Sequence, residues 1–265
     1  MPSPLIIKIG GVALEQQRAA ASLWLAIATL HSTVPGGVVL VHGGGKAVDA
    51  LLTKLNMPTN RQEGIRITPP EQMDVIAGVL AGTLNKTLVG AINAASSVRA
   101  VGLCLGDGGA MRTTKTTRYS FDPGSVGEVD AKSDGQLLKT LLASNFLPVL
   151  CSVGISPEGA LLNVNADDAA AGVARVLHAR GLVLMTDVPG VKDGSGKLVS
   201  RLDAAAIERM IATGEVSGGM IPKVKAALET SRAISAPVTI LSGTDTTQFE
   251  NWASGVSTGT TVAAR

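Results

Sequence analysis

The 265-residue sequence has few aromatic side chains and almost no excess of charge. Aromatic residues make up 2% of the chain, and 23 basic against 21 acidic residues give a formal net charge of +2. Nucleic-acid binding depends on many basic contacts and often on aromatic stacking, so this composition argues against it. We therefore expect small molecules as the ligands.

Cysteines and long apolar runs are also scarce. Cys104 and Cys151 stand alone within apolar segments, which gives no support to a disulfide framework or a zinc site. We expect both to be buried thiols in a reducing cytoplasm. The N-terminal letters MPSPLIIKIGG lack the cationic and long apolar parts of a signal peptide, and the segment SLWLAIATL is too short to span a membrane. We predict a cytoplasmic protein without a membrane anchor.

Short apolar segments separated by helical patterns predict the fold. Six such segments do not alternate with polar residues, which is typical of strands buried on both faces. Strands that alternate with helices form βαβ units, so we expect an α/β fold with a mostly parallel central sheet. Such sheets bind ligands at the carboxyl ends of their strands. The segments are PLIIKI, GVVLV, AVGLCL, FLPVLCSVGI, GLVLMT and PVTIL.

The longest helical pattern begins in the segment RITPPEQ. Thr68 and Glu71 there predict a capping box, with Pro69 as the first helical residue. The apolar positions continue so far that the helix is either a dimerisation element or a core helix of a monomer. Two segments rich in turn residues, 112–129 and 191–199, predict hairpins.

Three glycine-rich turns each join a predicted strand to a predicted helix. Glycines let backbone N–H groups approach an anion closely, and the following helix adds its positive end. The alternative is that glycine only closes a tight turn. The turns are Gly10–Gly11 after Lys8, Gly43–Gly45 before Lys46, and Gly218–Gly219 before Lys223.

Two common nucleotide-binding motifs do not fit the second turn. A P-loop requires a glycine where Leu40 stands and a serine or threonine where Ala47 follows the lysine. The dinucleotide motif G-x-G-x-x-G fits Gly43 and Gly45 but fails at Val48. The sequence therefore argues against a P-loop enzyme and against a nicotinamide-dependent reductase.

An ordered set of motifs closely resembles the acetylglutamate kinases of the amino acid kinase family. The resemblance runs from about Leu5 to the last residues and keeps the family's order and approximate spacing. It implies a three-layer α/β/α sandwich. It also implies transfer of the γ-phosphoryl group of ATP to the side-chain carboxylate of N-acetyl-L-glutamate, an early step of arginine biosynthesis. The motifs are IIKIGG, LVHGGGKAVD, GIRITP, AGTLNKTLV, LNVNADDAA, TDVPGV and GGMIPKV.

The resemblance further implies how the chain is divided. Residues 1–179 would hold the acyl amino acid and pair two subunits into a homodimer, and residues 180–265 would bind the nucleotide. ATP would act with Mg²⁺ held mainly by its phosphates, without protein metal ligands. Arginine-inhibited relatives carry an extra N-terminal helix, whereas Lys8 lies near the first residue here, so we expect a dimer insensitive to arginine. Thr261 stands where many relatives have an arginine.

The resemblance also assigns roles to individual residues. Lys8 and Lys223 would stabilise the transition state, Gly11 and Gly44 would supply backbone N–H groups, and Asp167 would hold both lysines in place. The start of an alanine-rich helix is in any case a favourable place for the carboxylate of Asp167.

Substrate and nucleotide contacts follow from the same resemblance. Arg66 offers a planar fork suited to the α-carboxylate, with an ion pair to a neighbour as the alternative. Asn163 and the backbone of Gly44 and Gly45 would complete this pocket. The nucleotide-binding residues would be Asp187, Val188, Pro189, Gly190, Val191, Lys192, Glu215, Val216 and Ser217.

The implied reaction needs fixed cations rather than a general base. A glutamate side chain, with a pKa near ~4.3, is already an anion at neutral pH. We therefore expect His42 to be structural. Two alternatives to this function are a kinase of an N-modified aminoadipate and a non-catalytic sensor of an amino acid and a nucleotide. The joint presence of Lys8, Asp167 and Lys223 argues against the sensor.

Overall fold

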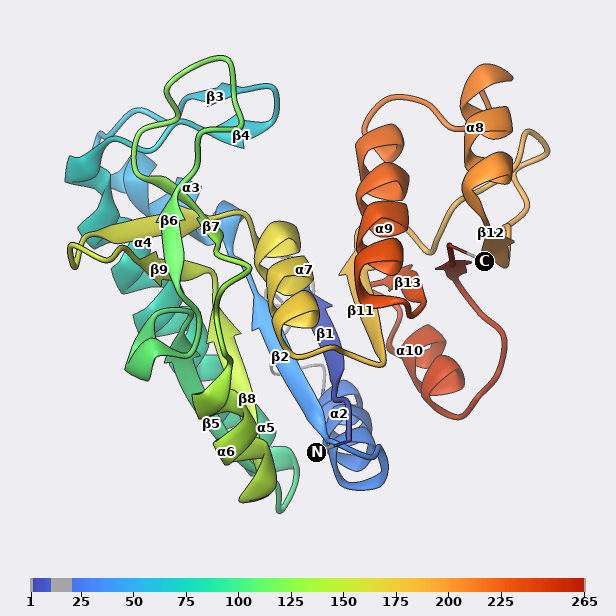
Figure 1. Cartoon of the computed structure of the whole chain (residues 1–265), viewed down its shortest axis with the longest axis horizontal. Coiled ribbons are helices and arrows are strands. Elements are labelled where there is room, and N and C mark those ends of the chain that lie inside the picture. The colour runs from blue at the N-terminus through green and yellow to red at the C-terminus, as the bar shows by residue number, and fades with distance from the viewer. Residues whose placement is uncertain (1, 11–20, 265) are drawn as a thin grey trace.

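The structure is a computed structural model, and it describes residues 2–10 and 21–264. Its central element is an eight-stranded sheet (Figure 1). The strands follow the order β12 (Arg201–Leu202), β14 (Thr260–Val262), β13 (Val238–Ser242), β11 (Gly181–Thr186), β1 (Leu5–Ile9), β2 (Val38–His42), β8 (Phe146–Cys151) and β5 (Arg99–Cys104).

The strands from β13 to β5 are all parallel, whereas β14 is antiparallel to β13 and parallel to β12. Each of the six apolar segments contributes one strand to this sheet. The predicted α/β fold with a mostly parallel sheet is confirmed.

Helices cover both faces of the sheet and make the predicted three layers. On β1, Ile6 joins the hydrophobic cluster of one helix layer, and Ile7 joins the cluster of the other, next to Trp24. Successive strand residues point to opposite faces, so a strand covered on both sides is apolar at nearly every position. The first layer contains α6 (Gln136–Ala143), α7 (Ala166–Val176), α8 (Ala204–Ala212) and α9 (Met220–Ile234), and the second contains α2 (Ala21–Thr33), α5 (Asn85–Ala95) and α10 (Thr246–Ala253).

Smaller β elements lie beyond the carboxyl ends of the central strands (Figure 1). Both predicted hairpins are present: β6 pairs with β7, and Lys192 forms an antiparallel bridge with Leu198. Directly after β2 the chain enters α3 (Gly45–Lys54). The smaller strands are β6 (Thr113–Lys115), β7 (Val126–Val129), β10 (Leu161–Val164) and β9 (Val153–Ile155) in one sheet, and β3 (Arg61–Gln62) and β4 (Ile65–Arg66) in a hairpin.

The long helical pattern forms one continuous run with four parts. These are η1 (Pro70–Gln72), α4 (Met73–Ala77), the π-helical η2 (Gly78–Leu84) and α5. The predicted capping box is wrong, because the run starts at Pro70 without a side-chain cap. Thr68 instead accepts a hydrogen bond from the side chain of Asn163 at 3.0 Å. A contact distant in sequence has replaced the local one.

Of the described residues, only Pro70–Ala95 forms a helix long and apolar enough to cross a membrane, judged by length and composition alone. A core helix of a soluble protein satisfies the same criterion. Leu88 and Ile92 of this run are fully buried within the layer that contains α2. One face of the run therefore packs in the core.

Gly172 of α7 provides a test of this packing. A Cβ atom there would lie 2.6 Å from the Cβ of Val129 on β7, whereas a Cβ on Gly90 of α5 would meet nothing within 4 Å. We expect Gly172→Ala to lower the free energy of unfolding by about 1–3 kcal/mol through overpacking. Gly90→Ala should instead leave it unchanged or raise it by up to about 1 kcal/mol. Urea denaturation of both variants measures this, and equal effects would contradict the close approach of α7 to β7.

Candidate active site

A cavity of about 240 Å³ opens where β1 and β2 end. Its walls come from these strand ends, the glycine turn before α3, the β3–β4 hairpin and the start of α7. This is the position expected for a ligand of a parallel α/β sheet. Six predicted site residues line it: Lys8, Gly44, Gly45, Arg66, Asn163 and Asp167.

Lys8 and Asp167 form an ion pair in this cavity. The Nζ atom of Lys8 lies 2.9 Å from Oδ1 of Asp167, and the lysine side chain is only 13% exposed. Asp167 belongs to the first turn of α7, which Asn165 caps by accepting the N–H groups of Asp167 and Asp168. The predicted helix start is thus present here, and it places the carboxylate beside the catalytic candidate Lys8.

The glycine turn after β2 is fixed by the helix behind it. A Cβ atom on Gly44 would collide with the side chain of Leu84 and lie 2.9 Å from Cδ2 of Leu80. Gly44 precedes α3, whose N-terminus has no side-chain cap. The first N–H groups of an uncapped helix lack an intrahelical partner and are suited to an anion. Close approach and anion binding therefore both require glycine at this turn.

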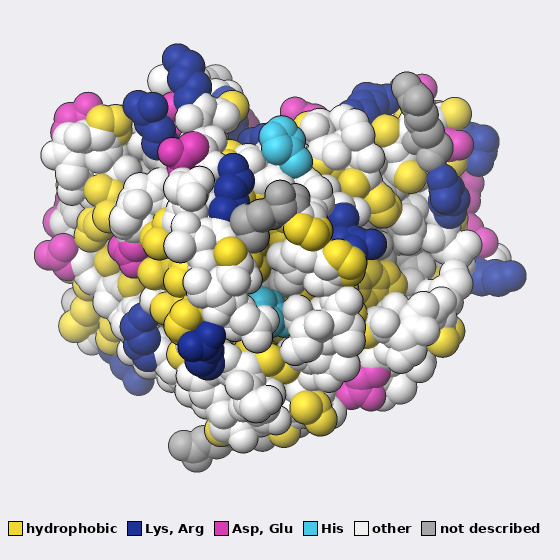
Figure 2. Space-filling view, turned by 60° about the horizontal axis from the view of Figure 1, so that its bottom comes forward, with side chains coloured by type: hydrophobic (Ala, Val, Ile, Leu, Met, Phe, Trp, Pro, Cys, Tyr) yellow, Lys and Arg dark blue, Asp and Glu magenta, His cyan; other side chains and the backbone are white. Residues whose placement is uncertain are grey.

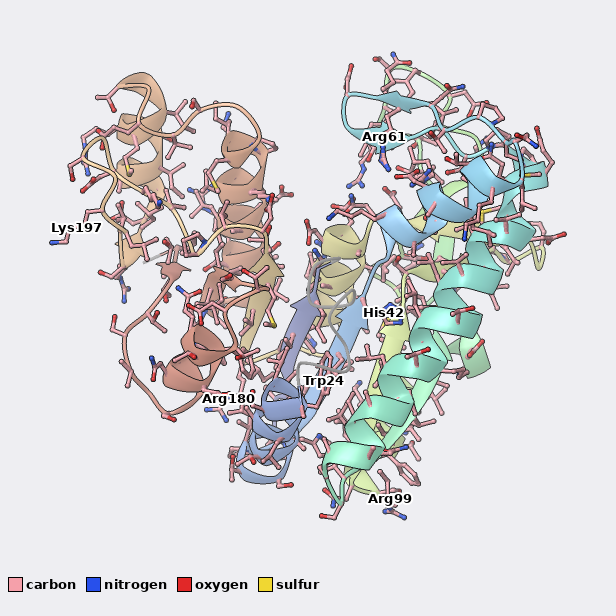
Figure 3. All side chains as sticks on the ribbon, turned by 180° about the vertical axis from the view of Figure 1, so that it is seen from behind. Trp24, His42, Arg61, Arg99, Arg180 and Lys197 are labelled. Atoms are coloured by element: carbon pink, nitrogen blue, oxygen red, sulfur yellow. The ribbon has the colours of Figure 1, made fainter. Side chains whose placement is uncertain are left out.

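Arg66 is held by an aspartate that the sequence did not single out. Its NH1 atom lies 2.6 Å from Oδ1 of Asp49, and its NH2 donates to the carbonyl of Gly45 at 3.2 Å. Arg61 extends from the same hairpin (Figure 3), and its NH2 atom lies 2.7 Å from the other carboxylate oxygen of Asp49. The ion-pair alternative for Arg66 is therefore present. A guanidinium has five N–H donors, so Arg66 keeps donors for a ligand carboxylate as well.

The charge state of Asp49 follows from these contacts. Burial acts to raise the pKa of its carboxyl group, but hydrogen bonds and charge interactions with Arg66 and Arg61 outweigh burial and hold the pKa below the ordinary value. Asp49 is thus ionised at neutral pH. Asp49 holds the two guanidinium groups together beside the glycine turn. A Cβ atom on Gly45 would lie 3.9 Å from the NH2 atom of each arginine.

A second cavity, of about 320 Å³, adjoins the first. It shares Lys8, Gly10, Gly45 and Arg61 with the first cavity and adds Thr186 and Asp187 from the end of β11. Gly10 is confined as well, because a Cβ there would lie 2.8 Å from the carbonyl oxygen of Met185. The second cavity thus lies between the end of β1 and the end of β11.

Lys223, in the first turn of α9, is bound at the edge of the second cavity. Its Nζ atom donates to Oγ1 of Thr186 at 2.8 Å and to Oδ1 of Asp187 at 2.9 Å. The hydrogen bond from Lys223, followed by that from Thr186, lowers the pKa of Asp187 to about 2. The resemblance implies that Asp167 holds both lysines. In this structure Asp167 contacts Lys8, and Lys223 contacts Asp187 instead.

The remaining predicted residues have different surroundings. Gly11 lies outside the described residues. Val191 and Val216 are buried core side chains, so only their backbone is suited to a nucleotide. The backbone carbonyl of Pro189 accepts a hydrogen bond from Gln248, and Glu215 accepts one from Gly194. Of the predicted nucleotide residues, Asp187 lines the second cavity; the others line neither cavity: Val188, Pro189, Gly190, Val191, Lys192, Glu215, Val216 and Ser217.

His42 is a structural residue, as predicted. It is fully buried, its Nδ1 lies 2.8 Å from the carbonyl oxygen of Gly43, and its Nε2 lies 3.1 Å from Nδ2 of Asn85. An amide NH₂ donates to an unprotonated ring nitrogen, so the proton of the neutral imidazole is on Nδ1. Burial lowers the pKa of His42 to about 4. The neutral ring joins the end of β2 to α5.

The model of the amino acid kinase family matches residues 3–242 of this chain. The chain belongs to the amino acid kinase family. An acetylglutamate kinase of Pectobacterium carotovorum subsp. carotovorum is 43% identical over 262 residues, which cover 99% of this chain and 100% of that protein.

Solved structures of other proteins agree with this family fold. The N-acetylglutamate synthase from Neisseria gonorrhoeae, complexed with coenzyme A and N-acetyl-glutamate, has a TM-score of 0.85 at 22% identity over 99% of this chain and 60% of its own. The carbamate kinase from Giardia lamblia bound to AMP-PNP has a TM-score of 0.71 at 17% identity, covering 100% of this chain and 99% of its own. At these identities the likeness concerns the fold.

Several charged residues around the two cavities were not predicted from the sequence. Asp49 and Arg61 had no recognisable motif, although Arg61 lies only five positions before Arg66. Asp168, which the sequence did not single out, forms an ion pair with Arg118. Burial raises the pKa of Asp168, and the charge of Arg118 opposes that rise. This ion pair ties the loop between β6 and β7 to the start of α7.

The lowered pKa of His42 predicts how the free energy of unfolding depends on pH. His42 has a folded-state pKa of about 4, whereas its ordinary value is 6.5. The unfolded chain therefore binds the proton more readily, and the stability present above pH 6.5 is lost as the pH falls towards 4. For His42→Gln we expect the decrease in unfolding free energy between pH 7 and pH 4.5 to be about 2 kcal/mol smaller than in the wild type.

Urea denaturation at the two pH values measures this difference. His178→Gln is the matched control, because His178 is exposed. An identical pH dependence in the wild type and His42→Gln would contradict the neutral, buried state of His42.

Proposed function

We propose that this chain is an ATP-dependent acetylglutamate kinase that phosphorylates the side-chain carboxylate of N-acetyl-L-glutamate in arginine biosynthesis. The observation that carries the proposal is one cavity in which the ammonium of Lys8, the guanidinium of Arg66 and the uncapped N-terminus of α3 converge. These groups suit a substrate with two carboxylates. The curated relative that is 43% identical over its full length, an acetylglutamate kinase, supports the same activity.

Substrate orientation follows from the two ends of this cavity. Arg66 and Asn163 would bind the α-carboxylate and the acetamide at one end, and the side-chain carboxylate would lie towards Lys8 and Gly44 at the other. The carboxylate is already an anion at neutral pH and attacks the γ-phosphorus directly. A general base is not needed, which agrees with the neutral, fully hydrogen-bonded His42.

The main obstacle to this reaction is repulsion between two anions. A lysine about 4 Å from a unit negative charge contributes on the order of 4 kcal/mol at an effective dielectric constant near 20. Lys8 would act from the end of β1, and Lys223 from the first turn of α9 across the second cavity. Both would stabilise the charge that develops on the equatorial oxygens of the transferring group.

Mg²⁺ would be held by the phosphates rather than by a protein cage. Among the described residues, no three His, Cys, Asp or Glu side chains gather closely enough to hold a metal ion. Mg²⁺ usually keeps several waters and takes few protein ligands, so the second cavity fits a metal that arrives with the nucleotide. When bound, the ion supplies further positive charge to the phosphate chain.

The two parts of the chain would bind different substrates. Residues 1–179 would hold the acyl amino acid, because the predicted substrate residues that line the first cavity all precede position 180. Residues 180–265 would hold the nucleotide through the end of β11 and the start of α9. We also propose a cytoplasmic homodimer that pairs through Pro70–Ala95, since much of this apolar run is not buried within one chain.

A hydroxamate assay tests the substrate directly. Hydroxylamine traps the acyl phosphate that forms when ATP phosphorylates a carboxylate. We expect ATP-dependent hydroxamate with N-acetylglutamate, and little with free glutamate or an N-modified aminoadipate. Activity with free glutamate alone would contradict the substrate, activity with the aminoadipate derivative would favour the second kinase, and binding without turnover would favour the sensor.

Substitution of the two lysines tests the mechanism. We expect Lys8→Ala and Lys223→Ala each to lower kcat by at least about 10²-fold, because each removes a preorganised charge from the transition state. Lys225→Ala is the matched control, since Lys225 is exposed on the same helix as Lys223. Steady-state kinetics measures all three variants, and near-normal turnover in both site variants would refute the assigned roles.

A further inference from the structure

Two thiols that are far apart in the sequence lie in contact in the fold. Cys104 ends β5 and Cys151 ends β8, and the two residues are direct partners in the parallel pairing of these strands. Their sulfur atoms are 3.6 Å apart. The sequence predicts that both thiols are buried. Cys151 is buried, but Cys104 is partly exposed, so that prediction is wrong for Cys104.

The positions of these residues permit a covalent bond. Neighbouring strands lie about 4.7–4.9 Å apart, which falls within the Cα separations of about 4.4–6.8 Å that disulfides span. Bond formation requires the sulfurs to approach to about 2.05 Å. β5 is the outermost strand on its side of the eight-stranded sheet, next to β8 (Figure 1). A strand with one neighbour has more freedom to shift than a central strand.

The two thiols differ in ways that suit a two-step oxidation. Cys151 donates its S–H to the sulfur of Cys104, and this hydrogen bond lowers the pKa of Cys104. The same contact, together with burial, raises the pKa of Cys151. The partly exposed Cys104 is therefore the thiol that an oxidant reaches first, and its lowered pKa favours the reactive thiolate form, whereas the protonated Cys151 lies behind it.

We propose that Cys104 and Cys151 are an oxidation site, at which a hydroperoxide forms a reversible disulfide within one chain. The thiolate of Cys104 attacks the peroxide, the O–O bond breaks, and a sulfenic acid forms while the leaving oxygen takes up a proton. The sulfur of Cys151 then attacks the sulfur of Cys104, its proton goes to the departing hydroxide, and water leaves. In sum, two thiols lose two electrons and two protons, and hydrogen peroxide becomes two waters.

The disulfide would act on the candidate active site through the end of β8. Ser152, directly after Cys151, lines the first cavity, and its N–H donates to the carbonyl of His42 at 3.1 Å. Its own carbonyl accepts from Val164, next to the substrate candidate Asn163. A bond that draws β5 and β8 together therefore strains the wall of the substrate cavity.

Thiol counting tests the cross-link without reference to activity. The chain contains two cysteines in total, so full formation leaves none. After treatment of the reduced, full-length protein with hydrogen peroxide, titration in denaturant should fall from two thiols to zero. The intact mass should fall by about 2 Da, and dithiothreitol should reverse both changes. Two remaining thiols, added oxygen without loss of the second thiol, or a cross-link between two chains would overturn the proposal.

Two variants test the assigned order of events. In Cys151→Ser the oxidised Cys104 should persist as a sulfenic acid that dimedone traps, because no second thiol can displace the hydroxide. In Cys104→Ser the buried Cys151 should keep its thiol under the same treatment. Oxidation of Cys151 at the wild-type rate in Cys104→Ser would contradict the role of Cys104 as the entry point.

The effect on catalysis rests on the proposed function. We expect the disulfide form to have a KM for N-acetylglutamate at least about threefold higher than the reduced form, because small displacements in a substrate site weaken binding and alignment. Dithiothreitol should restore the value. Absence of kinase activity in the reduced protein would refute the proposed function. An active reduced protein with an unchanged KM after cross-linking would refute only the link to the cavity.

Discussion

The ion pair between Lys8 and Asp167 is the interaction on which the candidate site depends. Lys8 lies near the end of a central strand, where its side chain is almost enclosed. An unpaired ammonium in such a place would lose much of its hydration without compensation. Asp167 offsets this cost, and the cap that Asn165 provides fixes the turn carrying the carboxylate. The pair thus keeps a cation at the strand end before any ligand arrives.

The other cations of the site are also paired with carboxylates. Asp49 is shared by Arg61 and Arg66, and Asp187 pairs with Lys223. Together with Lys8 and Asp167 these groups comprise four cations and three carboxylates, so one positive charge is in excess. Such an arrangement attracts an anion but limits repulsion among the cations when the cavities hold only water. Each aspartate also fixes the direction from which its cation meets a ligand.

The sequence predicted elements and motifs well because these depend on local patterns. Short apolar segments identified six strands of the central sheet, and the alanine-rich composition identified the start of the helix that carries Asp167. The failures concern pairs that are far apart in the sequence and that only the tertiary fold brings together. Thr68 meets Asn163, and Cys104 meets Cys151, across separations of 95 and 47 residues. A capping box is predicted only from residues that are close in the sequence. Such a prediction cannot include the competition of Asn163 for the hydroxyl group of Thr68.

The packing of the long helix fixes the glycine turn of the candidate site. Leu80 and Leu84 belong to the π-helical part of the long helix, and both would meet any side chain at position 44. Single turns of π-helix are frequent at functional sites, where they redirect side chains that a regular helix would place elsewhere. Here they hold the turn against the end of β2, and the turn cannot relax without opening a buried contact. Backbone donors that are fixed in this way need little reorganisation when charge develops on a phosphoryl group, and this is what makes them effective in a transition state.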